Sequence, residues 1–426
     1  MTSTLFRNVT VVRADGALCQ NGFVGVQGSR VVYVDNVPPM QEFDEVIDGA
    51  GKTLTAGLVN AHTHVGMSLM RGYGEDMPLN NWLFDRIFPF EDKLCGEAVY
   101  WSSLLGIAEM IKTGTTAFSD MYFFCEDTVK AVLESGIKAN IGRGISCFDE
   151  SQKFADLAAY RDLCALIPAF DGADDGRLRI DVAPHAEYTT RPDILHDAAD
   201  LAAKHHLRMQ VHVSETRDEH LACVGRHGKT PTAVLAQAGV LSQPLTVAHG
   251  VWLTDSDREQ LAEHGVTVAH CAKSNLKLGS GIADIPALQK AGVTVAVGTD
   301  SAASNNSLNM ADELRTAALL QKGVCHNPTV LPAEQIWYMG TRAGALSQGR
   351  DDCGDVAVGM RADLVLWDTN TLLGCPLSDI LYGGDTKVQL TMVDGKVLYS
   401  NGQFTTLDIE KIRQEAKRCA QNINSK

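Results

Sequence analysis

The amino-acid sequence predicts an α/β fold, a (β/α)8 barrel of the TIM type with a small β-sandwich domain built from both chain ends. Three observations support this prediction. Strand-like runs alternate with helical patterns through the middle of the chain, and short alternating strands mark both ends. The length of 426 residues, 45% of them hydrophobic, suits one barrel plus an accessory domain. We expect the N-terminal part of the sandwich at 1–56, the barrel at 57–350, and the C-terminal part with a terminal helix at 351–426.

The two chain ends share one sequence pattern. Residues 23–27 and 31–34 alternate apolar and polar side chains between Gly, Asp and Asn turns, which is typical of short β-strands. The same pattern returns at 362–367 and 388–397, so we expect both ends to pair into one sandwich beside the barrel. The polar stretch 408–426 is expected to form a surface helix.

The middle of the chain alternates strands with helices. A helical pattern at 193–205 precedes a strand-like run at 207–213, and another at 255–263 precedes 266–269. This alternation predicts a parallel sheet, and its repetition over about 300 residues favours a closed barrel. No Gly-x-Gly-x-x-Gly pattern follows an early strand, which weakens a dinucleotide-binding interpretation. The segment 67–91 is expected to be a long loop that covers the site.

The composition limits the possible partners. A formal net charge of −15 argues against nucleic acid or an anionic membrane surface, which leaves a small-molecule substrate. The first residues lack a signal-peptide pattern and no run of eighteen apolar residues occurs, so we expect a soluble cytoplasmic protein. We also expect a homo-oligomer. Eleven cysteines without a Cys-x-x-Cys pair fit reduced thiols better than disulfides.

Polar residues at strand ends indicate a metal site. His62 and His64 stand two residues apart at the end of an apolar run, so in a strand their imidazoles point the same way. His212, His249 and Asp300 each follow another short apolar segment. A parallel barrel gathers the carboxyl ends of its strands at one face. Three histidines and one aspartate suit zinc or another divalent transition metal and leave a position for water.

Four motifs resemble those of the amidohydrolase superfamily, and they are most similar to the S-adenosylhomocysteine/methylthioadenosine deaminases, which are related to the triazine chlorohydrolases. The motifs are Asn60–His64, His212–Thr216, Ser274–Gly281 and Gly298–Asn306. The resemblance runs from about residue 5 to residue 410. It implies hydrolytic deamination of an aminated purine nucleoside, with release of ammonia.

The resemblance also implies roles for individual residues. It assigns one divalent metal ion per chain, zinc first with iron and manganese as alternatives, to His62, His64, His212 and Asp300. Glu215, three residues past His212, would move protons between water and substrate. His249 would orient the attacking hydroxide, and Asp300 would also help to move the second proton. The implied substrate-binding residues are Trp82, Glu91, Arg143 and His185.

Two departures from the family pattern concern the substrate. The deaminases have a second arginine shortly after the position of Arg143, and residues 145–155 contain none. Glu187 adds a negative charge where the substrate tail is expected. Both changes favour a neutral thioether or a plain nucleoside over a substrate with an amino-acid tail.

Three alternatives stay open at this point. The protein could deaminate another aminated heterocycle such as a pterin or guanine, or it could displace chloride or an amine from a triazine. A barrel that binds without catalysis is the third alternative, although all four ligands are present. Whether His270 and Cys271 line the pocket is also left open by the sequence.

Overall fold

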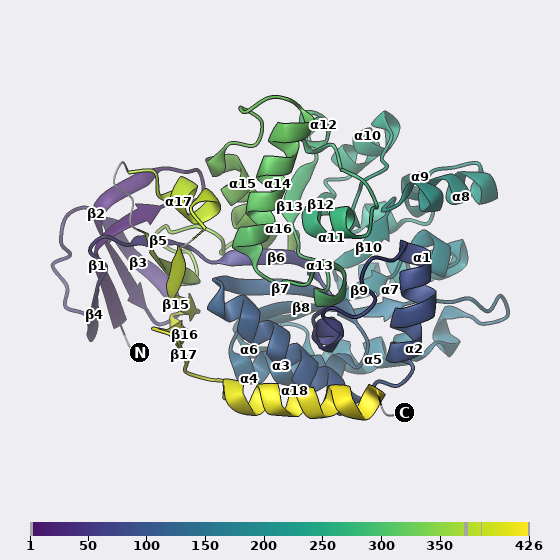
Figure 1. Cartoon of the computed structure of the whole chain (residues 1–426), viewed down its shortest axis with the longest axis horizontal. Coiled ribbons are helices and arrows are strands. Elements are labelled where there is room, and N and C mark those ends of the chain that lie inside the picture. The colour runs from purple at the N-terminus through teal and green to yellow at the C-terminus, as the bar shows by residue number, and fades with distance from the viewer. Residues whose placement is uncertain (1–2, 370–373, 385, 425–426) are drawn as a thin grey trace.

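The computed structural model describes residues 3–369, 374–384 and 386–424. It consists of a parallel eight-stranded barrel surrounded by helices and a separate mixed β-sheet made from the two chain ends (Figure 1). This architecture confirms the predicted fold class. In the described part of the chain, no helix is both long and apolar enough to cross a membrane.

The barrel strands follow one another in chain order. Neighbouring strands pair in parallel from β6 through to β13. The eight strands are β6 Leu58–Thr63, β7 Thr115–Tyr122, β8 Lys138–Ile145, β9 Leu178–Pro184, β10 Met209–Val213, β11 Leu245–His249, β12 Thr267–His270 and β13 Thr294–Val297. The amide of Asp300, just past β13, donates to the carbonyl of His62 on β6 at 3.0 Å, which brings the last strand end against the first. A Cβ atom at Gly298 would lie 2.7 Å from the His62 nitrogen, so glycine is required for this approach.

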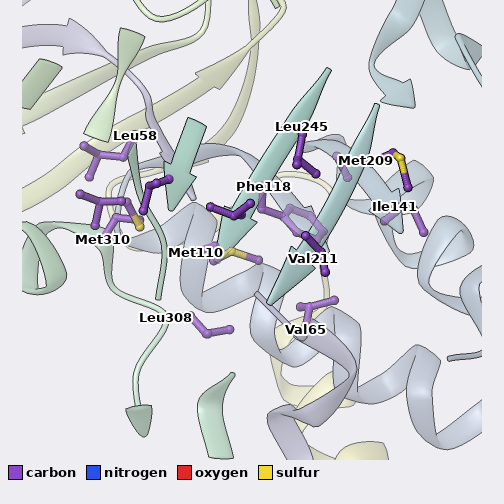
Figure 2. Packing of buried hydrophobic residues seen from close by; sticks show 14 of the residues in the cluster. Leu58, Val65, Met110, Phe118, Ile141, Met209, Val211, Leu245, Leu308 and Met310 are labelled. Carbon is purple, nitrogen blue, oxygen red and sulfur yellow. The ribbon is translucent and has the colours of Figure 1, made fainter. Parts of the chain in front are cut away.

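Helices cover the outside of the barrel. They bury apolar stripes; in α7, for example, Ile194, Leu195, Ala198 and Leu201 face the strands. Figure 2 shows part of this packing, with Leu58 among the labelled side chains. The helices are α3 Gly96–Lys112, α4 Cys125–Ser135, α5 Ala158–Phe170, α6 Ala173–Gly176, α7 Pro192–His205, α8 Arg217–His227, α9 Pro231–Gln237, α10 Asp255–Glu263, α11 Ala272–Lys277, α12 Ile285–Lys290, α13 Ala302–Asn305, α14 Met310–Val324, α15 Ala333–Gly340 and α16 Arg342–Ser347, with short 3-10 turns η3 Phe154–Asp156, η4 Glu187–Thr189 and η5 Val240–Ser242.

The segment 67–91 is largely helical, whereas the sequence predicts a loop. It contains η1 Val65–Met70, α1 Leu79–Asn81, the π-helix η2 Trp82–Ile87 and α2 Phe88–Glu91. The elements α1, η2 and α2 follow one another without a break over residues 79–91, and the sequence prediction missed them because the π-helical turn and Pro89 interrupt a regular 3.6-residue pattern. Their apolar side chains form one cluster that includes Trp82, Leu83 and Phe90.

The two chain ends form one mixed nine-stranded sheet. Its strands are β1 Ser3–Val12, β2 Leu18–Gln27, β3 Arg30–Asp35, β4 Glu45–Asp48, β5 Thr53–Ala56, β14 Leu364–Asp368, β15 Lys387–Val393, β16 Lys396–Ser400 and β17 Gln403–Phe404. The join is antiparallel pairing of β5 with β14, where Leu54 lies opposite Leu366. Helix α17 spans Pro376–Tyr382, and α18, Ile409–Asn424, lies along the barrel helix α3 (Figure 1).

A buried ion cluster joins the barrel to this sheet. Lys138 begins β8 and is 2% exposed. Its ammonium group donates to Asp363 and, at 2.7 Å, to Asp394. Arg361 lies 3.4 Å from the same oxygen of Asp394. The start of a barrel strand, opposite to the ends that carry the predicted ligands, is thereby tied to the C-terminal strands.

Candidate active site

The structure brings the four predicted metal ligands together. His62 lies on β6, His64 directly follows it, His212 lies on β10, and Asp300 follows β13. The Nε2 atom of His64 is 3.3 Å from Oδ1 of Asp300 and 3.2 Å from Nε2 of His212. His62 Nε2 is 3.8 Å from the same carboxylate oxygen. Side chains from three separate strand ends therefore converge on one point.

The hydrogen bonds behind these histidines fix their ring protons. Nδ1 of His64 faces the carbonyl of Met121, and Nδ1 of His212 faces the carbonyl of His185 at 2.7 Å. Because a carbonyl only accepts, each Nδ1 carries a proton, and Nε2 is the ring atom that faces the site. Nε2 of His62 is buried without a partner. The donor set thus fits a metal ion.

The protonation states of the three histidines are also compatible with a bound metal ion. Burial lowers the pKa of His62 and of His212 well below the usual range, which keeps both imidazoles neutral. Burial alone would lower the pKa of His64 as well, yet Asp300 raises it to about 9. Asp300 therefore favours positive charge beside it, and neutral imidazoles with an ionised carboxylate are the forms that bind a divalent ion.

Two serines orient Asp300. Ser274 and Ser304 donate to its Oδ2 atom at 2.6 and 2.7 Å, which leaves Oδ1 turned toward the histidines. Burial alone would raise the pKa of Asp300, but the surrounding imidazoles hold it well below the usual range. The aspartate is therefore an ionised, oriented carboxylate.

Three residues at the strand ends adopt the left-handed backbone conformation. Their φ angles are 48° at Ser214, 70° at His249 and 59° at Asp300. Such values are uncommon outside glycine and cluster at functional sites. They turn the chain sharply after β10, β11 and β13, where the candidate residues lie.

Glu215 and His249 lie beside the ligand cluster. Nε2 of His249 is 3.7 Å from Oε2 of Glu215. Ser280 donates to Oε1 of Glu215 at 3.0 Å, and Nδ1 of His249 contacts Oδ1 of Asn275 at 2.8 Å. An amide oxygen only accepts, so Nδ1 of His249 carries the proton and its Nε2 faces the site. One carboxylate oxygen of Glu215 is held, and the other is turned toward the histidine.

A cavity of about 580 Å³ opens over this cluster. It is lined by the predicted substrate residues Trp82, Glu91, Arg143 and His185 as well as by Glu215 and His249. Its lining also includes His64, His212 and Asp300, whereas His62 is not part of it. A largely apolar cavity with a few convergent polar groups is the usual form of a small-molecule site.

Burial changes the charge of the cavity-lining groups. It raises the pKa of Glu91 to about 7 and lowers that of His185 to about 4. Nδ1 of His185 lies 3.0 Å from Oγ1 of Thr189. Arg143 is bound to Asp162 at 2.7 Å and to the carbonyl of Gly144. Its guanidinium is therefore already paired.

Glu187 does not face the substrate cavity, contrary to the expectation from the sequence. It is 4% exposed and binds Arg226 at 2.5 Å and His227 at 2.7 Å. These partners lie on α8, 39 and 40 residues further along the chain, so local sequence gave no sign of them. The carboxylate is neutralised within the protein.

Several residues that contribute to the site were not predicted from the sequence. Ser274 and Ser280 belong to a recognised motif, but their partners are visible only after the loops fold. Phe148 lines the cavity and was not singled out. His270 and Cys271 are completely buried and are not among the cavity-lining residues.

A parallel barrel with this donor set at its strand ends defines a barrel hydrolase. The family described as the Amidohydrolase family matches residues 53–398, and the chain belongs to that family.

The relatives point to one branch of the family. The chain is 39% identical over 428 residues to a 5-methylthioadenosine/S-adenosylhomocysteine deaminase of Desulforudis audaxviator, covering 98% of each chain. It is 38% identical over 414 residues to a 5'-deoxyadenosine deaminase of Methanothermobacter thermautotrophicus, covering 96% of each. An adenosine deaminase structure from Xanthomonas campestris with bound zinc is 30% identical, with a TM-score of 0.93 and coverage of 100% and 99%.

Proposed function

We propose that the protein is a metal-dependent deaminase that replaces the amino group of an adenosine-type nucleoside with oxygen and releases ammonia. The observation that supports this most is the position of Glu215 and His249 directly beside the ligand cluster, in one cavity. The names of the relatives add support, since they are deaminases of such nucleosides.

His62, His64, His212 and Asp300 would hold one divalent ion per chain, with zinc as the first choice. An ion bound there would lower the pKa of water from 15.7 toward about 7 and supply hydroxide at neutral pH. Zinc is favoured because imidazole and carboxylate donors suit it, although iron and manganese accept the same donors. The zinc in the solved relative supports the same choice.

Glu215 would act as the general acid and base. Its free oxygen can accept a proton from the attacking water and deliver it to the purine ring nitrogen. Ser280 holds the other oxygen, so the carboxylate keeps one orientation during both transfers. General acid and base catalysis of this kind contributes about 10² to 10⁴ in rate.

His249 and Asp300 would complete the reaction. His249 lies within 3.7 Å of Glu215 and would stabilise negative charge that develops on the attacking oxygen. Asp300 would receive the second proton and pass it to the departing ammonia. Trp82, Glu91, Arg143 and His185 would position the nucleoside, because all four line the cavity.

Ammonia release from a panel of adenosine derivatives, pterins, guanine and triazines tests the proposal. We expect turnover with the adenosine derivatives and at most weak turnover with the others. Turnover confined to pterins, guanine or triazines, or none at all, would disprove it.

We also propose a cytoplasmic location and a homo-oligomeric state. The cytoplasmic location fits a chain with eleven cysteines and no Cys-x-x-Cys pair. Light scattering of the purified protein measures its oligomeric state.

A further inference from the structure

We propose that the outer end of the cavity selects nucleosides with an uncharged, apolar group at the 5′ position and disfavours those with a carboxylate there. This inference rests on the proposed function, because it assumes that the base reacts at the ligand cluster. It names the substrate class that the site takes.

The shape of the substrate sets which part meets the outer end. The amino-bearing ring carbon must reach the cluster of His64, His212 and Asp300 at the strand ends. The ribose is attached to the other ring of the purine, on the side away from the amino group. The substituent at the 5′ carbon is therefore the part of the molecule that lies farthest from the cluster.

Four phenylalanines line the cavity, and two of them are exposed. Its lining includes Phe88, Phe123, Phe124 and Phe148. Phe124 is 41% exposed and Phe148 is 68% exposed, so both present an apolar face to the solvent at the opening. Exposed apolar residues at a cavity mark a ligand-binding surface, and covering these rings with an apolar group removes them from water.

The loop that carries Phe148 is held in place. Arg191 donates to the carbonyls of Asp149 and, at 2.8 Å, of Gln152, and it also binds Asp193 at 2.7 Å. These contacts fix the chain directly after Phe148, so the ring is presented by an anchored loop. They also use the guanidinium of Arg191, which is therefore committed to the loop.

Among the described residues that line the cavity, no unpaired lysine or arginine faces a substrate carboxylate. Arg143 is the single lysine or arginine among the described residues that line the cavity. It already binds Asp162 and stacks 5.3 Å from the centre of the Phe123 ring. Arg226 is bound to Glu187. A carboxylate entering here would lose its hydration without gaining a charged partner.

The remaining charges at the cavity are unfavourable for an anion. Glu91 and Asp92 both line it. A carboxylate on the substrate would be repelled by Asp92 and would compete with Asp162 for Arg143. An apolar group meets none of these penalties, so the outer end distinguishes substrates by charge.

Two substrates of equal length test the proposal. The 5′-butylthio and 5′-(3-carboxypropylthio) derivatives of 5′-deoxyadenosine differ only in a terminal methyl or carboxylate group. We expect kcat/KM for the butylthio compound to be at least about 10-fold higher, a ratio that corresponds to about 1.4 kcal/mol. Equal values, or a preference for the carboxylate or for S-adenosylhomocysteine, would overturn the inference.

Variants of Phe148 locate the effect. For each variant, kcat/KM is measured with the butylthio compound and with adenosine, and the first value is divided by the second. Phe148→Ala should lower this ratio at least about 5-fold. Phe148→Arg should raise kcat/KM for the carboxylate compound. Phe84→Ala is the control, because Phe84 is 57% exposed but does not line the cavity. An equal change in all substrates with Phe148→Ala would contradict the proposal.

The two proposals fail in different ways. If adenosine is deaminated but the methyl and carboxylate compounds react equally, only the substrate inference is wrong. If no adenosine derivative releases ammonia, the proposed function fails and the inference fails with it.

Discussion

At the scale of single residues, the hydrogen bonds behind the ligands decide which atoms face the site. The carbonyls of Met121 and His185 turn two imidazole Nε2 atoms inward. The hydroxyls of Ser274 and Ser304 leave one oxygen of Asp300 free. Mutation of such outer partners in metal sites typically costs about 10- to 100-fold in metal affinity or activity.

We predict one divalent ion per chain. The two candidate donor clusters of the described residues both include His62, so they outline a single site. Elemental analysis should find one ion, and a chelator should abolish turnover until metal is restored. His62→Ala should lower metal content and turnover together, whereas His264→Ala, at an exposed residue outside the cavity, should change neither. Two ions per active chain would contradict this prediction.

Glu215 should be needed for turnover and not for metal binding. Glu215→Gln keeps the shape of the side chain and removes its basicity. We expect a rate loss of at least about 10²-fold with unchanged metal content, measured by ammonia release and elemental analysis. Glu263→Gln, at an exposed position on α10, is the matched control. Near-normal turnover of Glu215→Gln would remove this residue from the mechanism.

At the scale of elements, the closure of the barrel positions the ligands. Asp300 follows β13 and His62 lies on β6, so the distance between these two strands sets the distance between two ligands. Gly298 permits the close approach because any Cβ atom there would meet the backbone of His62. The first and last strands of the barrel therefore share the candidate metal site.

Gly298→Ala should weaken metal binding. The added methyl group would lie 2.7 Å from the His62 nitrogen, so the strands must separate and the ligands with them. We expect lower metal content at a fixed zinc concentration and lower turnover. The control is Gly323→Ala in α14, where nothing lies within 4 Å and alanine favours the helix by up to about 1 kcal/mol. Unchanged zinc affinity in Gly298→Ala would show that closure is looser than described.

At the scale of the whole molecule, the barrel and the terminal sheet are joined by buried charge. Lys138 lies between Asp363 and Asp394, with 3% of its side chain exposed. Removing one partner from a buried ion cluster costs about 3 to 5 kcal/mol, because the remaining charges lose their compensation. This ammonium group therefore contributes to the join, together with Arg361 and with the hydrogen bond from Thr391 on β15 to the carbonyl of Ile111 on α3.

Lys138→Met should lower the midpoint of thermal unfolding by several degrees. Lys130→Met is the control, because its exposed pair with Asp127 contributes about 0 to 1 kcal/mol. Burial and Asp363 already raise the pKa of Asp394, and loss of Lys138 would raise it further. A carboxyl whose folded pKa is raised loses stability as pH increases, so the deficit should be larger at pH 8 than at pH 5. A deficit independent of pH would contradict this account.

The fold could be predicted from the sequence because its signals are periodic. Strand and helix patterns such as those of β10 and α7 repeat along the chain, and His62 and His64 lie at a strand end within a motif. The partner of Glu187 could not be predicted, since Arg226 is brought to it only by folding. The helical stretch at 79–91 was not predicted, because the π-helical turn η2 and Pro89 interrupt its period. The domain limits at 56 and 350 and the catalytic roles stay predictions.

The pairing of β5 with β14 ties this fold to the order of protein synthesis. The two strands lie about 300 residues apart in the sequence. At a synthesis rate of about 5 to 20 residues per second, β14 is made roughly 15 to 60 s after β5. All four residues of β5 are buried in the finished protein. Until β14 emerges, the β5 edge is unpaired and can join the same edge of a neighbouring nascent chain. Shielding by a chaperone over that interval therefore matters more for the N-terminal sheet than for the barrel, whose neighbouring strands arrive in succession.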